Sequence, residues 1–475
     1  MNYKEILSDL NLLKKYDVYA FDYIEYPHKS FWNKEIKETD IEDGILKLCD
    51  NQENTMFYVH IPFCEQLCMF CICHKQITSD YSKAVDYLKN SLLLEIDLMA
   101  KIINKSKNKK LNNKSKNKKL NIKEIYFGGG SPTYLREEEF IQLKNKLKSI
   151  IDFDNLNQFS FEIDPRRVDE NRLLFYADQG VDKLSFGIQD FDEKVQKNIN
   201  RVQPVSLMEN LLTSKVREKF RSINFDLLIG LPGQTKESIS TTIDSVIKLK
   251  PDRISLTYLT YKPDFHPYQR HMMMNELLPD FYRRKEIFVE ALDKLMSSRY
   301  VRTGFEHFAL PKDDVSKSIE NRKAYYNSFG ATTGECRSIL AIGRSSYSTF
   351  GDGLYYQNLY DQKEYQDKLQ NGKIPIERGW VMKKDDLIRR EIIKDIRTYF
   401  DLDFNKIFEK YQIDHEYFKK EFKLLKEFEK DKLLTFNDKH LLRLNEKGKH
   451  FSNLIGSVFD NFIDKPRLNS EIRPS

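Results

Sequence analysis

Hydrophobic and polar residues in the middle of the chain follow two alternating patterns. Short runs of β-forming residues are separated by longer stretches with the periodicity of amphipathic helices. The runs are residues 56–60, 124–128, 159–163, 183–187, 223–228 and 253–257, and the helical stretches are 82–103, 136–151, 171–179 and 236–249. Repeated strand–helix units predict an α/β fold with a parallel sheet. Six units fit a partial (β/α)6 barrel, whose chemistry lies at the carboxyl ends of the strands.

The same patterns divide the chain into three parts. We expect an N-terminal extension (1–54), the barrel (55–310) and a mostly helical C-terminal domain (311–475). Aromatic residues crowd residues 16–32, which predicts that the extension packs on the main domain. Helical patterns at 385–400, 404–411 and 415–429 are followed by a strand, a turn and a last helix, as in winged-helix domains. No recognition helix with base-reading residues is evident, so no nucleic-acid partner is expected.

One segment changes how the charge of the chain is interpreted. Residues 104–121 repeat nine residues, Asn-Lys-Ser-Lys-Asn-Lys-Lys-Leu-Asn, back to back, with eight lysines and no acidic residue. The eight positive charges of this segment exceed the chain's net charge of +6, so the other residues together carry a small net negative charge. Like charges and low hydrophobicity cannot supply a core, and we predict a disordered loop between the first helix and the second strand of the barrel.

Composition excludes several classes of protein. Apolar residues make up 40% and charged residues 32% of the 475 residues, enough for a sizeable core. No apolar run approaches the roughly 20 residues that span a bilayer. The first residues include acidic side chains and no apolar stretch, unlike a secretory signal. We therefore expect a cytoplasmic protein without a membrane partner.

Four of the six cysteines, Cys64, Cys68, Cys71 and Cys73, fall within ten residues. Thiolates suit iron–sulfur clusters or zinc, but a structural zinc site commonly uses two separated pairs of ligands. Here the first three cysteines lie on one loop after the first strand, with gaps of three and two residues, and no second pair follows. Cys73 stays open as a fourth ligand. Three thiolates on a four-iron cluster leave one iron free, which is typical of catalytic sites.

This cysteine loop resembles that of the radical S-adenosylmethionine (SAM) enzymes. Its surroundings resemble more specifically the oxygen-independent coproporphyrinogen III oxidase (coproporphyrinogen dehydrogenase) family. The resemblance covers roughly residues 56–460. Its motifs are Tyr-Val-His-Ile-Pro-Phe-Cys at 58–64, Gly-Gly-Gly-Ser-Pro-Thr at 128–133, Glu-Ile-Asp-Pro-Arg at 162–166, Ser-Phe-Gly-Ile-Gln-Asp-Phe at 185–191, Asp-Leu-Leu-Ile-Gly-Leu-Pro at 226–232, Gly-Phe-Glu-His-Phe-Ala at 304–309 and Asp-Asp-Leu-Ile-Arg-Arg at 385–390.

The resemblance implies a radical SAM barrel with two kinds of cofactor. A [4Fe-4S] cluster is held by Cys64, Cys68 and Cys71, and two SAM molecules bind beside it. We expect a catalytic role for Cys73 because it lies so near the open iron. The implied SAM contacts are Tyr58, Phe70, Gly129, Gly130, Ser131, Glu162, Gln189, Arg201, Asp226, Thr260 and Tyr347.

The residues themselves support part of this assignment. The triple glycine allows the backbone to approach a ligand without Cβ atoms. Glu162, Gln189, Arg201 and Asp226 each place a polar group over the predicted barrel mouth. Taken singly, each has a plain structural explanation: Glu162 and Arg201, for example, are equally suited to a structural ion pair.

The resemblance also implies a reaction. One electron from the cluster cleaves SAM, and the resulting 5′-deoxyadenosyl radical takes a hydrogen atom from the β carbon of a propionate. Loss of CO2 and a further electron leaves a vinyl group, twice per substrate, giving protoporphyrinogen IX in haem biosynthesis. The implied partners are a tetrapyrrole and an electron donor, and we expect a monomer. Arg166, Arg167 and Arg344 are candidates, by charge, to bind the propionates.

The chain departs from the family pattern mainly on the substrate side. Residues 327–333 lack a Gln and a Tyr of the family, Tyr347 replaces a small aliphatic residue, and Thr260 replaces an Ala. Two other hypotheses therefore stay open. One is a radical enzyme on another tetrapyrrole, such as a haem-remodelling methyltransferase. The other is a haem-binding or haem-delivery protein without oxidase activity, in which His60 or His74 would be an axial ligand.

Overall fold

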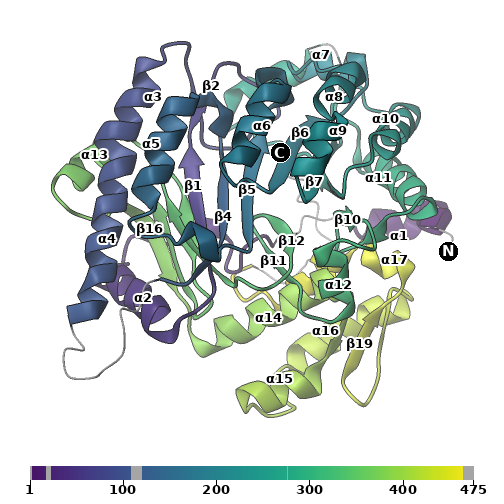
Figure 1. Cartoon of the computed structure of the whole chain (residues 1–475). Helices are drawn as coiled ribbons and strands as arrows, with labels where there is room; N and C mark the ends of the chain where they lie inside the picture. Colours follow the sequence, from purple (N-terminus) through teal and green to yellow (C-terminus); the bar gives the residue numbers. More distant parts are fainter. Residues whose placement is uncertain (1–2, 18–22, 109–119, 275, 464–475) are drawn as a thin grey trace.

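Seven adjacent parallel strands form the centre of the computed structural model, which describes residues 3–17, 23–108, 120–274 and 276–463 (Figure 1). In spatial order they are β13 (Ser338–Ile342), β1 (Thr55–Ile61), β4 (Ile122–Gly129), β5 (Gln158–Ile163), β6 (Lys183–Gln189), β7 (Ser222–Ile229) and β8 (Arg253–Tyr258). Six of them are the strands expected from the sequence. Their carboxyl ends therefore meet at one edge, as the barrel hypothesis requires.

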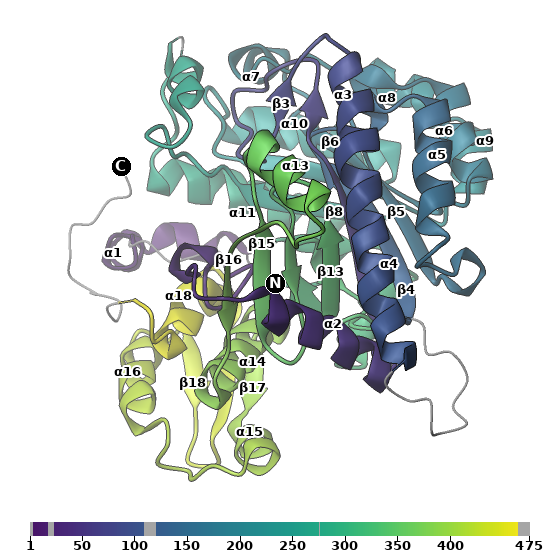
Figure 2. The same ribbon diagram turned by 90° about the vertical axis from the view of Figure 1, so that its left-hand side faces the viewer.

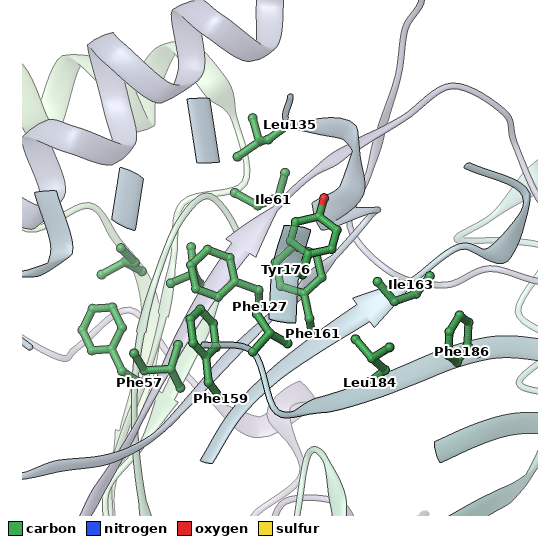
Figure 3. Close-up of a cluster of buried hydrophobic side chains, with 14 of the residues drawn as sticks. Phe57, Ile61, Phe127, Leu135, Phe159, Phe161, Ile163, Tyr176, Leu184 and Phe186 are labelled. Atoms are coloured by element: carbon green, nitrogen blue, oxygen red, sulfur yellow. The ribbon is translucent and has the colours of Figure 1, made fainter. Parts of the chain in front are cut away.

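Helices cover the outer face of this sheet (Figures 1 and 2). Aromatic and branched side chains of the strands pack against them, and Phe127 of β4 stacks on Phe161 of β5 with ring centroids 5.5 Å apart (Figure 3). Helix 236–249 is found at the residues that its periodicity predicts. The covering helices are α3 (Ser82–Tyr87), α4 (Leu93–Asn108), α5 (Glu137–Leu147), α6 (Glu170–Asp178), α7 (Glu193–Asn198), α8 (Val205–Leu211), α9 (Ser214–Lys219), α10 (Lys236–Leu249) and α11 (Phe281–Ser297).

The sheet continues past residue 310, which corrects the expected boundary. Antiparallel strands extend it at both ends to twelve strands, in the order β16-β15-β14-β13-β1-β4-β5-β6-β7-β8-β10-β9. A mostly helical region from residue 311 is thus wrong for 325–381, whose strands pair with the barrel or with each other. The added elements are β9 (Val301–Arg302), β10 (His307–Ala309), α12 (Asp314–Glu320), β11 (Tyr325–Asn327), β12 (Gly330–Thr332), β14 (Tyr347–Thr349), β15 (Leu354–Asn358), α13 (Gln362–Gln370) and β16 (Ile376–Val381).

Residues 384–459 form a small separate layer below the sheet (Figure 2). The three expected helices and the expected strand near residue 441 are present, together with two further strands, one of which lies between the first and second helix; the three strands pair in the order β17-β19-β18. The predicted last helix is broken into two short ones. The elements are α14 (Lys384–Tyr399), β17 (Asp401–Asp403), α15 (Phe404–Tyr411), α16 (Lys419–Lys430), β18 (Leu434–Phe436), β19 (Leu441–Leu444), α17 (Glu446–Lys449) and α18 (Ser452–Gly456).

The N-terminal extension packs on two different cores. Helix α2 (Glu38–Asn51) buries Ile41 and Ile45 in the core of the main sheet. The residues before it, including α1 (Leu10–Lys15), join the C-terminal core instead. The Tyr16 ring stacks on the Phe428 ring, with centroids 5.3 Å apart, and its centroid lies 5.2 Å from that of Phe451. The extension therefore ties the C-terminal layer down, in addition to packing on the main domain.

The lysine-rich repeat is only partly described. Its first residues, 104–108, continue helix α4, which contradicts a loop that begins at residue 104. Leu120 is buried just before β4, and residues 109–119 lie outside the described residues. In the described part of the chain, no helix has both the length and the apolar character needed to cross a bilayer.

Candidate functional site

A large cavity of about 1490 Å³ opens at the carboxyl ends of the barrel strands and continues into the barrel. Strands β5 to β8, α11 and the β11–β12 hairpin all contribute to its wall, as do parts of the N- and C-terminal segments. Seven residues expected at the site line it: Phe70, Cys71, Cys73, Glu162, Gln189, Asp226 and Thr260.

The cysteine loop begins where β1 ends. Cys64 closes the short strand β2 (Phe63–Cys64), which pairs with β3 (Gln76–Ile77) and fixes both ends of the loop. Burial, together with the neighbouring Cys71 and Cys68, raises the pKa of Cys64 to about 12. The Cys71 N–H donates to the Cys68 carbonyl at 3.2 Å, so a turn joins the other two cysteines of the loop.

Two arginines lie beside Cys68, which is the most buried of the three cysteines. Arg201 Nη1 lies 3.4 Å and Arg166 Nη2 3.5 Å from its sulfur. Asp164 holds both guanidinium groups, with contacts of 3.4 Å to Arg201 and 2.7 Å to Arg166. Such outer partners orient a ligand and stabilise its thiolate form.

The donor set fits a cluster better than a single ion. Three soft thiolate donors lie on one loop, and the two cysteines outside the loop, Cys49 and Cys336, are buried elsewhere in the fold. Thiolates suit iron–sulfur clusters, whereas a structural zinc site commonly uses four ligands in two separated pairs.

A second segment, which no sequence motif marks, hydrogen-bonds to the backbone of the cysteine loop. The 3-10 helix Pro267–Met273, after β8, places Tyr268 so that its hydroxyl donates to the Cys71 carbonyl. Lys75 donates to the same carbonyl at 2.9 Å and to Tyr268 Oη at 2.8 Å. Gln269 Nε2 donates to the Phe70 carbonyl at 3.2 Å. No ligand-type motif marks these residues, so only the fold reveals them.

Cys73 lies inside the cavity beside Cys71. Its side chain is solvent-accessible, although protein surrounds it. The interaction between the two thiols lowers the pKa of Cys71 and raises the pKa of Cys73. Cys73 therefore adds a thiol to the cavity next to a predicted cluster ligand.

The triple glycine is required by protein packing as well as by any ligand. A Cβ on Gly128 would meet the Glu162 carboxylate at 2.8 Å, and one on Gly129 would meet the His60 ring at the same distance. Gly129 also has a backbone φ of +118°, in the left-handed region that favours glycine. Ser131 follows, and its hydroxyl lies 2.8 Å from that of Thr133.

A buried polar network crosses the ends of β4 to β7. Glu162 accepts the Gly129 N–H at 3.0 Å, and burial, followed by the charge of Asp226, raises its pKa to about 7. Asp226 accepts from Ser185 Oγ at 2.7 Å and from Asn224 at 2.8 Å. Both carboxylates line the cavity and keep acceptor capacity for a ligand.

The remaining expected contacts are placed unevenly. Gln189 is buried, has a φ of +69° and lines the cavity. Arg201 is not part of the cavity wall, and its guanidinium donates to the Gly187 carbonyl at 2.7 Å. Tyr58 packs on Phe329, with ring centroids 5.2 Å apart. Tyr347 lies outside the cavity wall, against Trp32. Thr260 is in the wall.

The three arginines suggested for propionate binding do not line the cavity. Arg166 is committed to Asp164 and Cys68, and Arg167 pairs with Glu65 at 2.5 Å. Arg344 is buried, and its guanidinium donates to Gln76 and Gln362. These pairings count against that hypothesis, because charge in the sequence does not tell which arginines are already paired. The cations that do line the cavity are Lys14, Lys183, Arg253, Lys262, Arg284 and Lys285.

The segment that departs from the family pattern lies on the cavity. All of residues 327–333, around the β11–β12 hairpin, contribute to the wall. Phe329 stacks on Tyr126 with ring centroids 4.1 Å apart. Gly330 has φ +84° and lies directly over His307. The sequence changes are thus located where a substrate would be contacted.

A substitution at Gly130 tests how closely the glycine turn supports the cysteine loop. A Cβ there would lie 2.9 Å from the Phe63 carbonyl oxygen and 3.0 Å from Cys64 Sγ, closer than real Cβ contacts. We expect Gly130→Ala to fold but to lose most of its iron after anaerobic reconstitution. Gly456→Ala, whose Cβ would meet only ordinary contacts at 3.6 Å or more, is the control. Normal iron and sulfide content in Gly130→Ala would contradict the prediction.

Comparison with known proteins gives the same assignment as the geometry. The family model "Radical SAM superfamily" matches residues 58–246. The oxygen-independent coproporphyrinogen III oxidase of Pseudomonas aeruginosa is 31% identical over 98% of this chain and 97% of its own length, and that of Helicobacter pylori is 31% identical over 88% and 89%. A solved structure of the Escherichia coli enzyme, described as a radical SAM enzyme, superimposes with a TM-score of 0.84 at 30% identity and covers 96% of this chain and 99% of its own. Such similarity from end to end, with the cysteine loop at the mouth of the cavity, means that the chain belongs to the oxygen-independent coproporphyrinogen III oxidase family of radical SAM enzymes.

Proposed function

We propose that this chain catalyses the oxygen-independent oxidative decarboxylation of two propionates of coproporphyrinogen III, which gives the vinyl groups of protoporphyrinogen IX. The observation that carries the proposal is a shared cavity: Cys71 and Cys73 line the same space of about 1490 Å³ as Glu162 and Asp226. Pockets for single small ligands measure about 300–1,000 Å³. The larger space suits SAM and a tetrapyrrole together.

Membership of the family gives the chain a [4Fe-4S] cluster and SAM as cofactors. Cys64, Cys68 and Cys71 would hold the cluster, and the thiol chemistry and outer arginines described above fit it. When bound, the two cofactors supply an organic radical that abstracts a hydrogen atom from an unactivated carbon. Each propionate loses one β hydrogen atom, one CO2 and one electron.

The protein's own residues position these partners and keep water away. We assign two SAM molecules to the polar network of β5 to β7, where Glu162, Gln189 and Asp226 offer acceptors and donors to amino and hydroxyl groups. The other expected contacts stay predicted SAM contacts; Thr260 lines the cavity, whereas Tyr58, Gly129, Gly130, Ser131, Arg201 and Tyr347 lie outside its wall. Aromatic side chains such as Phe70, Tyr126 and Phe329 line the cavity and limit side reactions of a radical.

The geometry does not favour a haem-delivery function that uses His60. Its Nδ1 lies 3.0 Å from the Tyr58 hydroxyl and its Nε2 3.1 Å from the His74 carbonyl. Burial lowers the pKa of His60 to about 4. Both ring nitrogens are therefore occupied, and an axial haem ligand needs one of them free.

A substrate assay tests the proposal. Cluster-loaded protein, kept anaerobic and given SAM, a chemical reductant and coproporphyrinogen III, is expected to release two CO2 and one protoporphyrinogen IX per substrate. Chromatography of the oxidised porphyrins separates product from substrate and from a three-propionate intermediate. Cleavage of SAM without any decarboxylated porphyrin would overturn the proposed substrate while leaving the radical SAM assignment intact.

Partners and location are proposed on the sequence alone. We propose a monomer in the cytoplasm that receives electrons from a separate donor and passes the last electron of each decarboxylation to an acceptor. The altered residues 327–333 favour no other tetrapyrrole by themselves, because they change the wall without adding a group that another reaction needs.

A further inference from the structure

One part of the cavity wall carries positive charge and is formed by elements other than the cysteine loop. Tyr258 ends β8, Arg284 and Lys285 occupy the second turn of α11, and His450 precedes α18. All four residues line the cavity. We call this group the basic wall. None of its members is among the residues expected to bind the cluster or SAM.

Lys285 is a buried cation without a buried anion. Its side chain is 7% exposed, and its ammonium donates one hydrogen bond, of 3.1 Å, to the His450 carbonyl. The rings of Tyr258, Phe281 and Phe451 surround the ammonium at 5.4 to 5.5 Å. Among the described residues, no carboxylate lies within ion-pair distance of it. Burial of a charge is costly unless an opposite charge or hydrogen bonds compensate for it.

The surroundings of Lys285 show which charges act on it. Burial, and next the charge of Arg284, lowers its pKa to about 8, while Glu306 and Asp17 favour the charged form. Lys285 therefore remains mostly protonated at neutral pH. Arg284 adds a second cation to the wall, and in the described part of the chain its guanidinium has no hydrogen bond or ion pair. Asp280, which also lines the cavity, caps α11 by accepting the Arg283 N–H at 2.8 Å, and within the described residues it forms no ion pair with Arg284 or Lys285.

Two polar atoms of the wall are buried without a partner. The Tyr258 hydroxyl and His450 Nδ1 have no hydrogen bond in the described part of the chain. Burial lowers the pKa of His450 well below its usual value, so the ring is neutral and carries one N–H. Buried polar atoms are normally satisfied, and an unsatisfied group indicates a missing ligand or water. Two cations and two unsatisfied hydrogen-bonding groups that face one space match a carboxylate.

We propose that the basic wall binds a propionate carboxylate of the tetrapyrrole substrate and so holds the macrocycle across the cavity from Cys73. The proposal rests on the function proposed above, because it assumes a substrate with several propionates. A carboxylate is also present on the methionine part of SAM. We assign the wall to the substrate because the polar network predicted for SAM lies on β5 to β7, whereas the basic wall lies on the end of β8, on α11 and on the C-terminal layer.

The test replaces Lys285 with methionine, which fits a cage of three aromatic rings without charge. Lys294→Met is the matched control, since Lys294 is on the same helix but pairs with Asp244 at 2.6 Å, away from the cavity. Binding of coproporphyrin III and of its tetramethyl ester to the cluster-loaded protein is measured anaerobically, in the same co-solvent, by porphyrin fluorescence. We expect Lys285→Met to weaken binding of the free acid about 10- to 100-fold. Binding of the ester should stay nearly the same, and Lys294→Met should change neither.

Kinetics separate the two sources of carboxylate. The KM for coproporphyrinogen III should rise in Lys285→Met, while the KM for SAM and the yield of SAM cleavage stay as in the wild type. Equal weakening of acid and ester would assign Lys285 a structural role and overturn the proposal. A raised KM for SAM with unchanged porphyrin binding would assign the wall to the cofactor and also overturn it. Wild-type protein that cleaves SAM but neither binds nor converts the tetrapyrrole would overturn the proposed function, and this subsite with it.

Discussion

Cys68→Ser is expected to lack the cluster and to release no 5′-deoxyadenosine from SAM. Cys68 is the most buried of the three predicted ligands, and Arg201 and Arg166 approach its sulfur at 3.4 and 3.5 Å. A serine hydroxyl stays protonated at neutral pH and is a harder donor than thiolate, so it is a poor ligand for iron–sulfur clusters. Iron and sulfide analysis of anaerobically reconstituted protein, together with chromatography of the nucleoside products, measures both losses.

The control for Cys68→Ser is a substitution at a cysteine outside the cluster loop. Cys49 is fully buried in helix α2 and packs in the core of the main sheet, far along the chain from the loop. Cys49→Ala should keep its iron and SAM cleavage, with at most a loss of about 1 kcal/mol in the free energy of unfolding. Full cluster content and 5′-deoxyadenosine production in Cys68→Ser would refute the assignment of Cys68 as a ligand.

The strands of the barrel could be predicted from the sequence because each is a local signal. Residues 253–257, for example, alternate in burial and follow a helix with a clear periodicity, and they form β8 in the structure. The cysteine loop was equally readable, since the spacing of Cys64, Cys68 and Cys71 is itself the motif. Signals of this kind need no knowledge of what lies opposite in the fold.

Long-range pairing could not be predicted in this way. Strand β13 is a buried run of five residues that lies parallel to β1, nearly 300 residues earlier in the chain. Nothing within β13 indicates that partner, so the expected barrel ended too early. The N-terminal tyrosines likewise gave no sign that Tyr16 would stack on Phe428 of the C-terminal layer.

Charged residues were the least predictable part of the site. Arg166 and Arg344 looked free in the sequence, but neighbouring side chains occupy both. No sequence motif marks Lys285, yet the fold places it in a buried wall of the cavity. Whether a charge is available depends on its partners in space, and these are fixed only by tertiary structure.

Cys73→Ala is expected to retain the cluster and to cleave SAM, but to form protoporphyrinogen IX at least about 100-fold more slowly than the wild type. The Cys73 side chain lines the cavity beside Cys71, on the same wall as Glu162 and Asp226. A thiol at this position can donate a hydrogen bond to a bound carboxylate and so help to position the reacting carbon. Single-turnover assays that count 5′-deoxyadenosine and porphyrin product separately measure the uncoupling, with Cys49→Ala as the control. Loss of iron in Cys73→Ala would instead make Cys73 a cluster ligand, and unchanged product formation would make it a packing residue. Because each role moves a different readout, iron content, SAM cleavage and porphyrin yield together decide which one this thiol has.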